Sequence, residues 1–169
     1  MSKNAAEKKE LSPRAKAISE LSWPLQHDEF HELVKKTVTV PVELGVFNDK
    51  GDILMFWRDD DYTGNHIPGT VLQDHQDVPT ALQRLLNSEV VGGEVTPPIE
   101  LGWKEILKGT GIGQNPTRHE VSLLYACWLT KPYQGKGGKF YPMNQLPDDT
   151  LPHHRVLIAE IVARLNRHR

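Results

Sequence analysis

The sequence predicts an α/β domain of the α+β type, in which a mixed β-sheet is sandwiched between helices. Runs of β-branched and apolar residues, bounded by turn residues, indicate strands in both halves of the chain. An amphipathic segment over 78–91 indicates one helix between these strands, and a second over 156–166 indicates a closing helix. Strands that are interrupted by one helix and followed by another are typical of a sheet covered by helices.

Length, composition and charge narrow the class of protein. The chain has 169 residues and is 38% hydrophobic, which suits one domain with a core. Its formal net charge of −2 provides no basic field for a nucleic acid, and no apolar run is long enough to span a membrane. The single cysteine, Cys127, has no partner for an internal disulfide. We therefore expect a cytoplasmic location and neither a nucleic-acid nor a membrane partner.

The first part of the chain is expected to form an arm that precedes the folded domain. Residues 1–25 are predicted to be mobile or partly helical, with a short helix over 13–22, and the domain is predicted to cover 26–169. A better helix is predicted over 26–36, because apolar residues recur there at helical spacing. The segment 13–36 could also dock a second copy of the chain, so a homodimer formed through this arm is one hypothesis.

A strand pair follows the arm. The β-branched segment 38–47 predicts a strand, and Pro41 within it indicates a sheet edge or a bulge. The turn over 48–51 leads into a second strand over 52–58. The acidic run that comes next, over 59–64, is expected to be a solvated loop.

The central helix is predicted from its cap and its apolar face. Asp77 is a candidate N-cap and Pro79 is tolerated in the first turn, while Leu82 and Leu85 lie on one face. The pair Gly92-Gly93 ends the helix.

Two more strands and two loops complete the prediction. Strands are expected over 98–107 and 119–129, and loops over 108–116 and 134–139. The closing helix follows over 156–166. The residues just before it, His153-His154-Arg155, could meet a nucleotide, although a role in capping the helix or a place on the surface is the commoner expectation.

Two segments carry the most specific chemical signal. The turn His66-Ile-Pro-Gly69 precedes, by about one helix length, the run Arg84-Leu-Leu-Asn-Ser-Glu89. Together they resemble the box of the Nudix hydrolases, which cleave nucleoside diphosphates linked to another group. That box carries acids at the positions of Leu85, Ser88 and Glu89, where spacings of three and four residues share one helix face. Carboxylates on that face can hold Mg²⁺, and only Glu89 is retained here.

Within that family the pattern is most similar to the GDP-mannose mannosyl hydrolase branch. The branch box reads Arg-Leu-Thr-x-Ala-Glu-Leu-Gly, and this chain has Arg-Leu-Leu-Asn-Ser-Glu-Val-Val-Gly over 84–92. The resemblance covers roughly residues 26–166. It implies a Nudix-like fold, a nucleotide-type small molecule as ligand, and Mg²⁺ or Mn²⁺ as cofactor if the chain is active.

The resemblance also implies a set of metal ligands. Glu89 matches the retained metal carboxylate, and Gly69 matches the loop glycine whose carbonyl reaches the metal. Gln134 matches one member of a Gln-His pair in the branch, but no histidine follows it in this sequence. The general base of the branch is therefore missing from its expected position.

Four further residues are candidates for substrate binding and catalysis. Arg58 and Arg84 match arginines that contact phosphates, which the forked guanidinium donors suit. Glu43 matches an aspartate that stabilises positive charge developing on the sugar. His119 opens the clearest strand and is a candidate general base.

Each candidate also has a plain structural interpretation. Glu89 could be a solvated acid at a helix end, Arg84 a structural ion-pair residue, and Glu43 a strand acid that faces solvent. His75 lies beside two loop acids, Asp74 and Asp77, and could form a substitute metal or base cluster, but loop polarity explains it equally well.

Two functional hypotheses follow from these matches and mismatches. The first is a Mg²⁺-dependent hydrolase of a nucleoside-diphosphate-linked compound, with a nucleotide sugar as the expected class. The second, motivated by the loss of two box acids, is a catalytically inactive Nudix-fold protein that binds a nucleotide or a protein partner.

Overall fold

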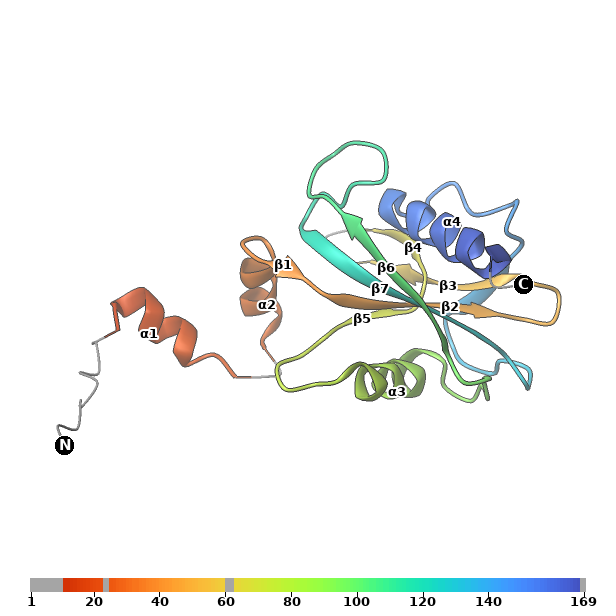
Figure 1. Ribbon diagram of the computed structural model, residues 1–169, viewed down its shortest axis with the longest axis horizontal. Coiled ribbons are helices and arrows are strands. Elements are labelled where there is room, and N and C mark those ends of the chain that lie inside the picture. The colour runs from red at the N-terminus through yellow and green to blue at the C-terminus, as the bar shows by residue number, and fades with distance from the viewer. Residues whose placement is uncertain (1–10, 23–24, 60–62, 168–169) are drawn as a thin grey trace, which may run out of the picture.

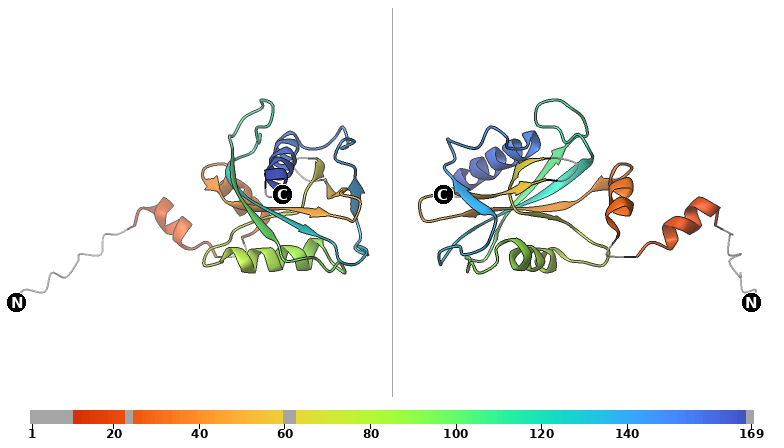
Figure 2. Two further views of the ribbon diagram at one scale, coloured as in Figure 1. Left: turned by 45° about the vertical axis from the view of Figure 1, so that its right-hand side comes forward. Right: turned by 180° about the vertical axis from the view of Figure 1, so that it is seen from behind.

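The sheet lies between two helices, which confirms the mixed α+β class. The computed structural model describes residues 11–22, 25–59 and 63–167. Helix α4 (Pro152–Arg167) covers one face of the sheet and α3 (Val78–Glu89) covers the other (Figure 1; Figure 2). The first ten residues, predicted to be polar and mobile, lie outside the described residues, as do residues 60–62 of the predicted acidic loop.

The remaining elements follow in chain order. They are α1 (Pro13–Ser19), α2 (His27–Val34), β1 (Val38–Thr39), β2 (Pro41–Phe47), β3 (Ile53–Arg58), β4 (Gly64–His66), β5 (Gly69–Val71), β6 (Ile99–Ile106), β7 (His119–Trp128) and β8 (Gly138–Tyr141). Among the described residues, no helix has the length and apolar character needed to cross a membrane.

The sheet is mixed, and β2 is central to it. Strand β2 is parallel to β7 and antiparallel to β3 and β5. Strand β1 is also parallel to β7, while β6 and β8 add antiparallel pairings to β7 and β3. All seven residues of β2 are buried, as expected for a strand covered on both faces.

Two hydrophobic layers hold the helices to the sheet. On one side Leu157 and Ile161 of α4 pack against sheet residues that include Leu124. On the other side Leu82 and Leu85 of α3 pack against the opposite face. Glu43 is a carboxylate in the otherwise apolar part of β2, and its burial makes it a marker for a site.

The N-terminal arm is only partly attached to the domain. Helix α1 has no buried residue and extends away from the sheet (Figure 1; Figure 2). Its N-cap is Ser12, whose hydroxyl accepts from the Ala15 N–H. Helix α2 lies near β1, and Val34 at its end is buried.

The closing helix differs from the sequence prediction at its beginning. It starts at Pro152, four residues earlier than predicted, because proline is well tolerated at the first helical position. His153 and His154 therefore lie in its first turn, where both are buried, so the expectation of a capping or surface role was wrong. Helix α3 also ends slightly early, at Glu89.

Candidate functional site

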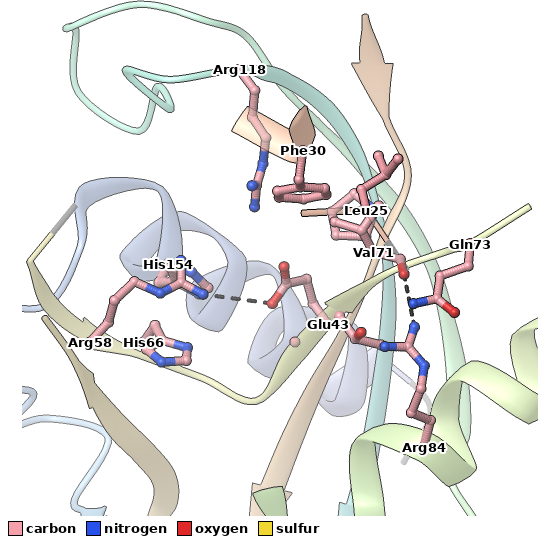
Figure 3. Close-up of a pocket in the computed structure, with 13 residues that line it drawn as sticks. Leu25, Phe30, Glu43, Arg58, His66, Val71, Gln73, Arg84, Arg118 and His154 are labelled. Atoms are coloured by element: carbon pink, nitrogen blue, oxygen red, sulfur yellow. Dashed lines mark hydrogen bonds and ion pairs between the residues drawn. The ribbon is translucent and has the colours of Figure 1, made fainter. Parts of the chain in front are cut away.

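A pocket of about 290 Å³ opens beside the buried carboxylate of β2 (Figure 3). Its walls come from segments that are far apart in the sequence. The lining residues are Leu25, Phe30, Pro41, Glu43, Arg58, His66, Gly69, Thr70, Val71, Gln73, Arg84, Arg118 and His154.

Glu43 lies in this pocket under a glycine. It is only 3% exposed, so the interpretation as a solvent-facing strand acid does not apply. Gly69 of β5 pairs with it across the sheet. A Cβ atom at Gly69 would lie 2.6 Å from the Oε2 atom of Glu43, so this position has no room for a side chain.

Buried histidines lie next to Glu43. The Nδ1 atom of His154 is 3.9 Å from the Oε2 atom of Glu43, and both side chains are almost fully buried. The ring centroid of His154 is 4.4 Å from that of His153 and 5.6 Å from that of His66. Within the described part of the chain, neither of the two facing atoms has a hydrogen-bond partner.

Burial drives this pair of side chains toward its neutral forms. It raises the pKa of Glu43 well above the usual range, and Glu120 raises it further, while Arg118 and Arg58 lower it. Burial also lowers the pKa of His154 well below its ordinary value, with His153 as the next cause. Burial therefore favours the uncharged forms of Glu43 and His154, while the arginines supply positive charge to the pocket.

Glu89 lies at the Pro-Gly turn, as the resemblance implies. Burial raises its pKa to about 7, although the charge of Arg58 and a hydrogen bond from the Gly69 N–H lower it. Its Oε2 atom is buried without a hydrogen-bond partner in the described chain. Tyr133 donates its hydroxyl to the Glu89 carbonyl over 3.3 Å, which anchors the end of α3.

Arg84 lines the pocket but already makes protein contacts. Its Nη2 atom donates to the Val71 carbonyl and to the Oε1 atom of Gln76, each over 3.0 Å. The guanidinium therefore ties α3 to the segment that follows β5.

Arg118 is the third arginine of the pocket, and it is not among the site residues predicted from the sequence. It directly precedes β7, and its Nε atom donates to the carboxylate of the fully buried Glu120 over 2.9 Å. Its neighbour His119, which opens β7, is the candidate general base predicted from the sequence. Successive strand residues point to opposite faces, so only one of the two could enter the pocket.

The structure brings most, but not all, of the predicted residues together. Glu43, Arg58, Gly69 and Arg84 line one pocket, and Glu89 contacts its Gly69 wall.

Two predicted residues lie elsewhere. His119 is outside the lining, with its Nε2 atom 2.9 Å from the Oε1 atom of Glu105. Gln134 is exposed and lies beside Gly92, after the end of α3.

Oxygen atoms near Gly69 fit a hard divalent cation only in part. The unpartnered carboxylate oxygens of Glu43 and Glu89 suit Mg²⁺ or Mn²⁺, and Mg²⁺ ordinarily keeps several waters and uses substrate phosphates. Among the described residues, no three His, Cys, Asp or Glu side chains form a group that could hold a metal. The exposed His75–Asp74 pair, at 3.3 Å, belongs to the loop before α3.

The comparison with known proteins rests on structure. No protein-family model matches the sequence, and a search of curated proteins finds no match to it. Three solved structures illustrate the likeness. A possible asymmetric diadenosine tetraphosphate hydrolase from Jonesia denitrificans is 14% identical with a TM-score of 0.60, covering 79% of this chain and 98% of its own. A mutT/nudix family protein from Listeria innocua is also 14% identical, with a TM-score of 0.59 and the same coverages.

The third structure is the Nudix domain of Shewanella oneidensis NrtR, crystallised with ADP-ribose. It is 13% identical with a TM-score of 0.57, and the match covers 91% of this chain and 99% of that domain. At such low identity the likeness concerns architecture, and it agrees with the element order and the sheet described above. This chain therefore has the Nudix fold.

Proposed function

We propose that this protein hydrolyses a nucleoside-diphosphate-linked compound, with a nucleotide sugar as the expected class and Mg²⁺ or Mn²⁺ as cofactor. The observation that carries the proposal is the position of Glu89, whose carboxylate accepts from Gly69 at the edge of an arginine-lined pocket. Solved structures of the same fold include a possible diadenosine tetraphosphate hydrolase and a domain bound to ADP-ribose, and both support a nucleotide ligand.

The residues of the pocket divide the work of binding. Arg58 holds a phosphate group, and Arg84 contributes positive charge while it fixes α3 to the wall. Glu89 and the Gly69 carbonyl would hold the metal ion. When bound, that ion supplies charge neutralisation at the diphosphate and lowers the pKa of a water molecule.

Glu43 acts on the group attached to the diphosphate. Burial raises its pKa, which favours the protonated carboxyl, and in that form Glu43 would donate a hydrogen bond to a substrate oxygen. In its ionised form the same carboxylate would stabilise positive charge that develops on the attached group. His119 lies outside the lining and takes part in no step of this scheme.

A substrate panel with a matched pair of variants tests the proposal. Nucleotide sugars, ADP-ribose, dinucleoside polyphosphates and nucleoside triphosphates are incubated with the protein and Mg²⁺ or Mn²⁺, and product release is measured. Glu89→Gln is expected to lower turnover about 100-fold or more, because metal stabilisation of the transition state amounts to several kcal/mol. Glu94→Gln, at an exposed acid paired with Lys131, is expected to match the unsubstituted protein.

Failure on either count ends the hydrolase proposal. Turnover that survives Glu89→Gln unchanged contradicts the role of that carboxylate, and absence of turnover across the whole panel contradicts the activity.

The second candidate is a protein that binds a nucleotide without hydrolysing it. The residues at positions 85 and 88 favour this candidate. Leu85 is 1% exposed and belongs to the core, while Ser88 donates its hydroxyl to the Leu85 carbonyl. Two of the three positions that carry acids in the box are thus occupied by residues that cannot bind Mg²⁺ as carboxylates. Calorimetry that shows nucleotide binding without turnover would favour this candidate, and Glu89-dependent turnover would dismiss it.

A further inference from the structure

Arg118 reaches the pocket from a different part of the chain than Arg58. Arg58 ends β3, whereas Arg118 directly precedes β7. Both line the pocket, and Figure 3 shows their side chains converging on Glu43 from two sides. The side chain of Arg118 is only 16% exposed, so its guanidinium is well shielded from solvent.

A buried carboxylate holds Arg118 in this direction. Glu120 is 0% exposed, and its Oε2 atom accepts from the Nε atom of Arg118 over 2.9 Å and from the Nδ2 atom of Asn115 over 3.2 Å. Its Oε1 atom accepts from the hydroxyl of Ser122 over 3.3 Å. Because the Nε edge of the guanidinium is bound to a fixed partner, its Nη end is directed at the cavity. Such preorganisation lowers the entropic cost of binding a ligand.

The charge of the pocket lining favours an anionic ligand. Three arginines and one carboxylate line the pocket, and Glu120 behind Arg118 carries the compensating charge of that arginine. Arg58 and Arg84 give the lining its surplus positive charge against Glu43. The chain as a whole has a net charge of −2, which makes this surplus local. The Nη2 atom of Arg84 donates to Val71 and Gln76, and its Nε atom has no hydrogen-bond partner in the described chain. Arg118 is the arginine that approaches Glu43 from a different side than Arg58 (Figure 3).

We propose that Arg118 binds the diphosphate of the ligand opposite Arg58, and that Glu120 is the positioning residue that aims it. Planar guanidinium donors match phosphate oxygens in pairs, and two arginines on opposite sides suit two adjacent phosphates. This inference rests on the proposed function for the class of ligand. It requires that the protein bind a diphosphate, but it does not require that the protein hydrolyse one. It assigns the pocket to ligands with at least two linked phosphates and predicts weaker binding of monophosphates.

Calorimetry with inorganic pyrophosphate, ADP and AMP tests this assignment. Arg118→Gln alone would leave the Glu120 charge buried and unpaired, which threatens folding. The double variant Arg118→Gln/Glu120→Gln removes both charges and avoids that problem. It is expected to weaken pyrophosphate and ADP binding about 10- to 100-fold, as expected for the loss of charge-assisted hydrogen bonds. Arg118→Lys keeps the positive charge but loses the paired guanidinium donors. Its affinity for pyrophosphate and ADP is expected to lie between those of the unsubstituted protein and the double variant.

Two further variants separate positioning from general damage. Glu120→Gln keeps a side chain that can bond to Asn115 and Ser122, but it loses the charged partner of Arg118. It is expected to reduce the preference for ADP over AMP while AMP affinity stays unchanged, which a merely structural role would not produce. Arg167→Gln, at an exposed arginine on the last turn of α4, is the matched control and is expected to bind like the unsubstituted protein.

The outcomes also separate this inference from the proposed hydrolysis. Equal pyrophosphate affinity in the double variant and the unsubstituted protein overturns the role of Arg118, even where turnover is found. Loss of affinity in the double variant supports that role, even where no substrate is turned over. Failure of the unsubstituted protein to bind either pyrophosphate or ADP also overturns the assignment.

Discussion

At the scale of single residues, burial shifts ionisable groups around the pocket toward their neutral forms. The pKa values of Glu43 and Glu89 are raised and those of His153 and His154 are lowered, with desolvation as the largest cause in each case. Perturbed groups that gather in one cleft are a physical indicator of a functional site. They also make the folding free energy depend on pH.

His153 should make the protein sensitive to acid. Its pKa is about 3 in the folded protein, so below pH 6.5 the unfolded chain binds a proton that the folded chain does not. The stability contributed by the neutral ring is therefore complete above pH 6.5 and is lost as pH falls from there toward 3. Compared with His153→Gln, the unsubstituted protein is expected to lose about 1.5 kcal/mol of unfolding free energy between pH 6.5 and 5.

Urea denaturation at the two pH values measures this difference. The raised pKa values of Glu43 and Glu89 make the unfolding free energy increase as pH falls, which is opposite to the effect of His153. Both acids are present in the parent and in the variant, so the difference between the two proteins reports His153. His75→Gln, at a side chain that is 94% exposed, is the control and is expected to follow the parent. Equal losses in the parent and His153→Gln would show that the ring is not held neutral.

At the scale of elements, the main role of α3 is to pack its apolar face against the sheet. Leu85 lies in the core with Leu82, Ser88 is exposed, and only Glu89 points to the Gly69 turn. The helix still begins with an Asp77 cap, whose carboxylate accepts from the Thr80 N–H over 2.9 Å. Its position against the sheet is what places Arg84 and Glu89 near the pocket.

A glutamate should therefore destabilise the protein at position 85 much more than at position 88. Leu85→Glu would bury an unpaired carboxylate in the core and is expected to lower the unfolding free energy by about 3–5 kcal/mol. Ser88→Glu is expected to stay within about 0.5 kcal/mol of the parent, because the side chain is exposed. Urea denaturation at neutral pH measures both, and a Leu85→Glu variant as stable as the parent would disprove the burial argument.

At the scale of the whole molecule, the described residues before β1 contribute to the pocket but little to the core. Helix α1 buries nothing, whereas Leu25 and Phe30 form part of the pocket wall. The sequence placed the domain boundary after residue 25, next to the segment that supplies this apolar wall.

Truncations should separate the two parts of the arm. Removal of residues 1–20 is expected to leave both the melting temperature and ADP affinity unchanged. Removal of residues 1–30 takes away Leu25 and Phe30 and is expected to weaken ADP binding about tenfold, since burial of one large apolar side chain stabilises by about 1.5–3 kcal/mol. Thermal unfolding and calorimetry measure these effects. Equal ADP affinity after both truncations would show that Leu25 and Phe30 do not contribute to ligand binding.

A third truncation, which removes residues 1–36, tests the predicted homodimer. If segment 13–36 docks a second copy, sedimentation will show a smaller species once it is removed. An unchanged oligomeric state would contradict docking through the arm.

The local sequence pattern was sufficient to predict the longer helices and strands, but not the short strands. Strands β2, β3, β6 and β7 and helix α3 were predicted within a few residues, because their periodicity extends over six residues or more. The three- and four-residue strands β4, β5 and β8 were missed, since such short segments carry no readable period and exist only through their partners. In the same way, the Gly69 turn was found from its sequence, but its contact with Glu43 depends on strand pairing.

The sequence by itself determined the fold class and the central helix, because these depend on the periodicity of residues close together in the chain. The expectation that the Pro-Gly turn meets Glu89 came from the resemblance to a known family, and the structure shows the contact through Gly69. Only the tertiary structure decided that Arg118 and His154 face Glu43 while His119 does not. Those placements depend on how β7 and the first turn of α4 pack against β2, and side chains more than seventy residues from Glu43 meet it only after the sheet and its covering helix have assembled.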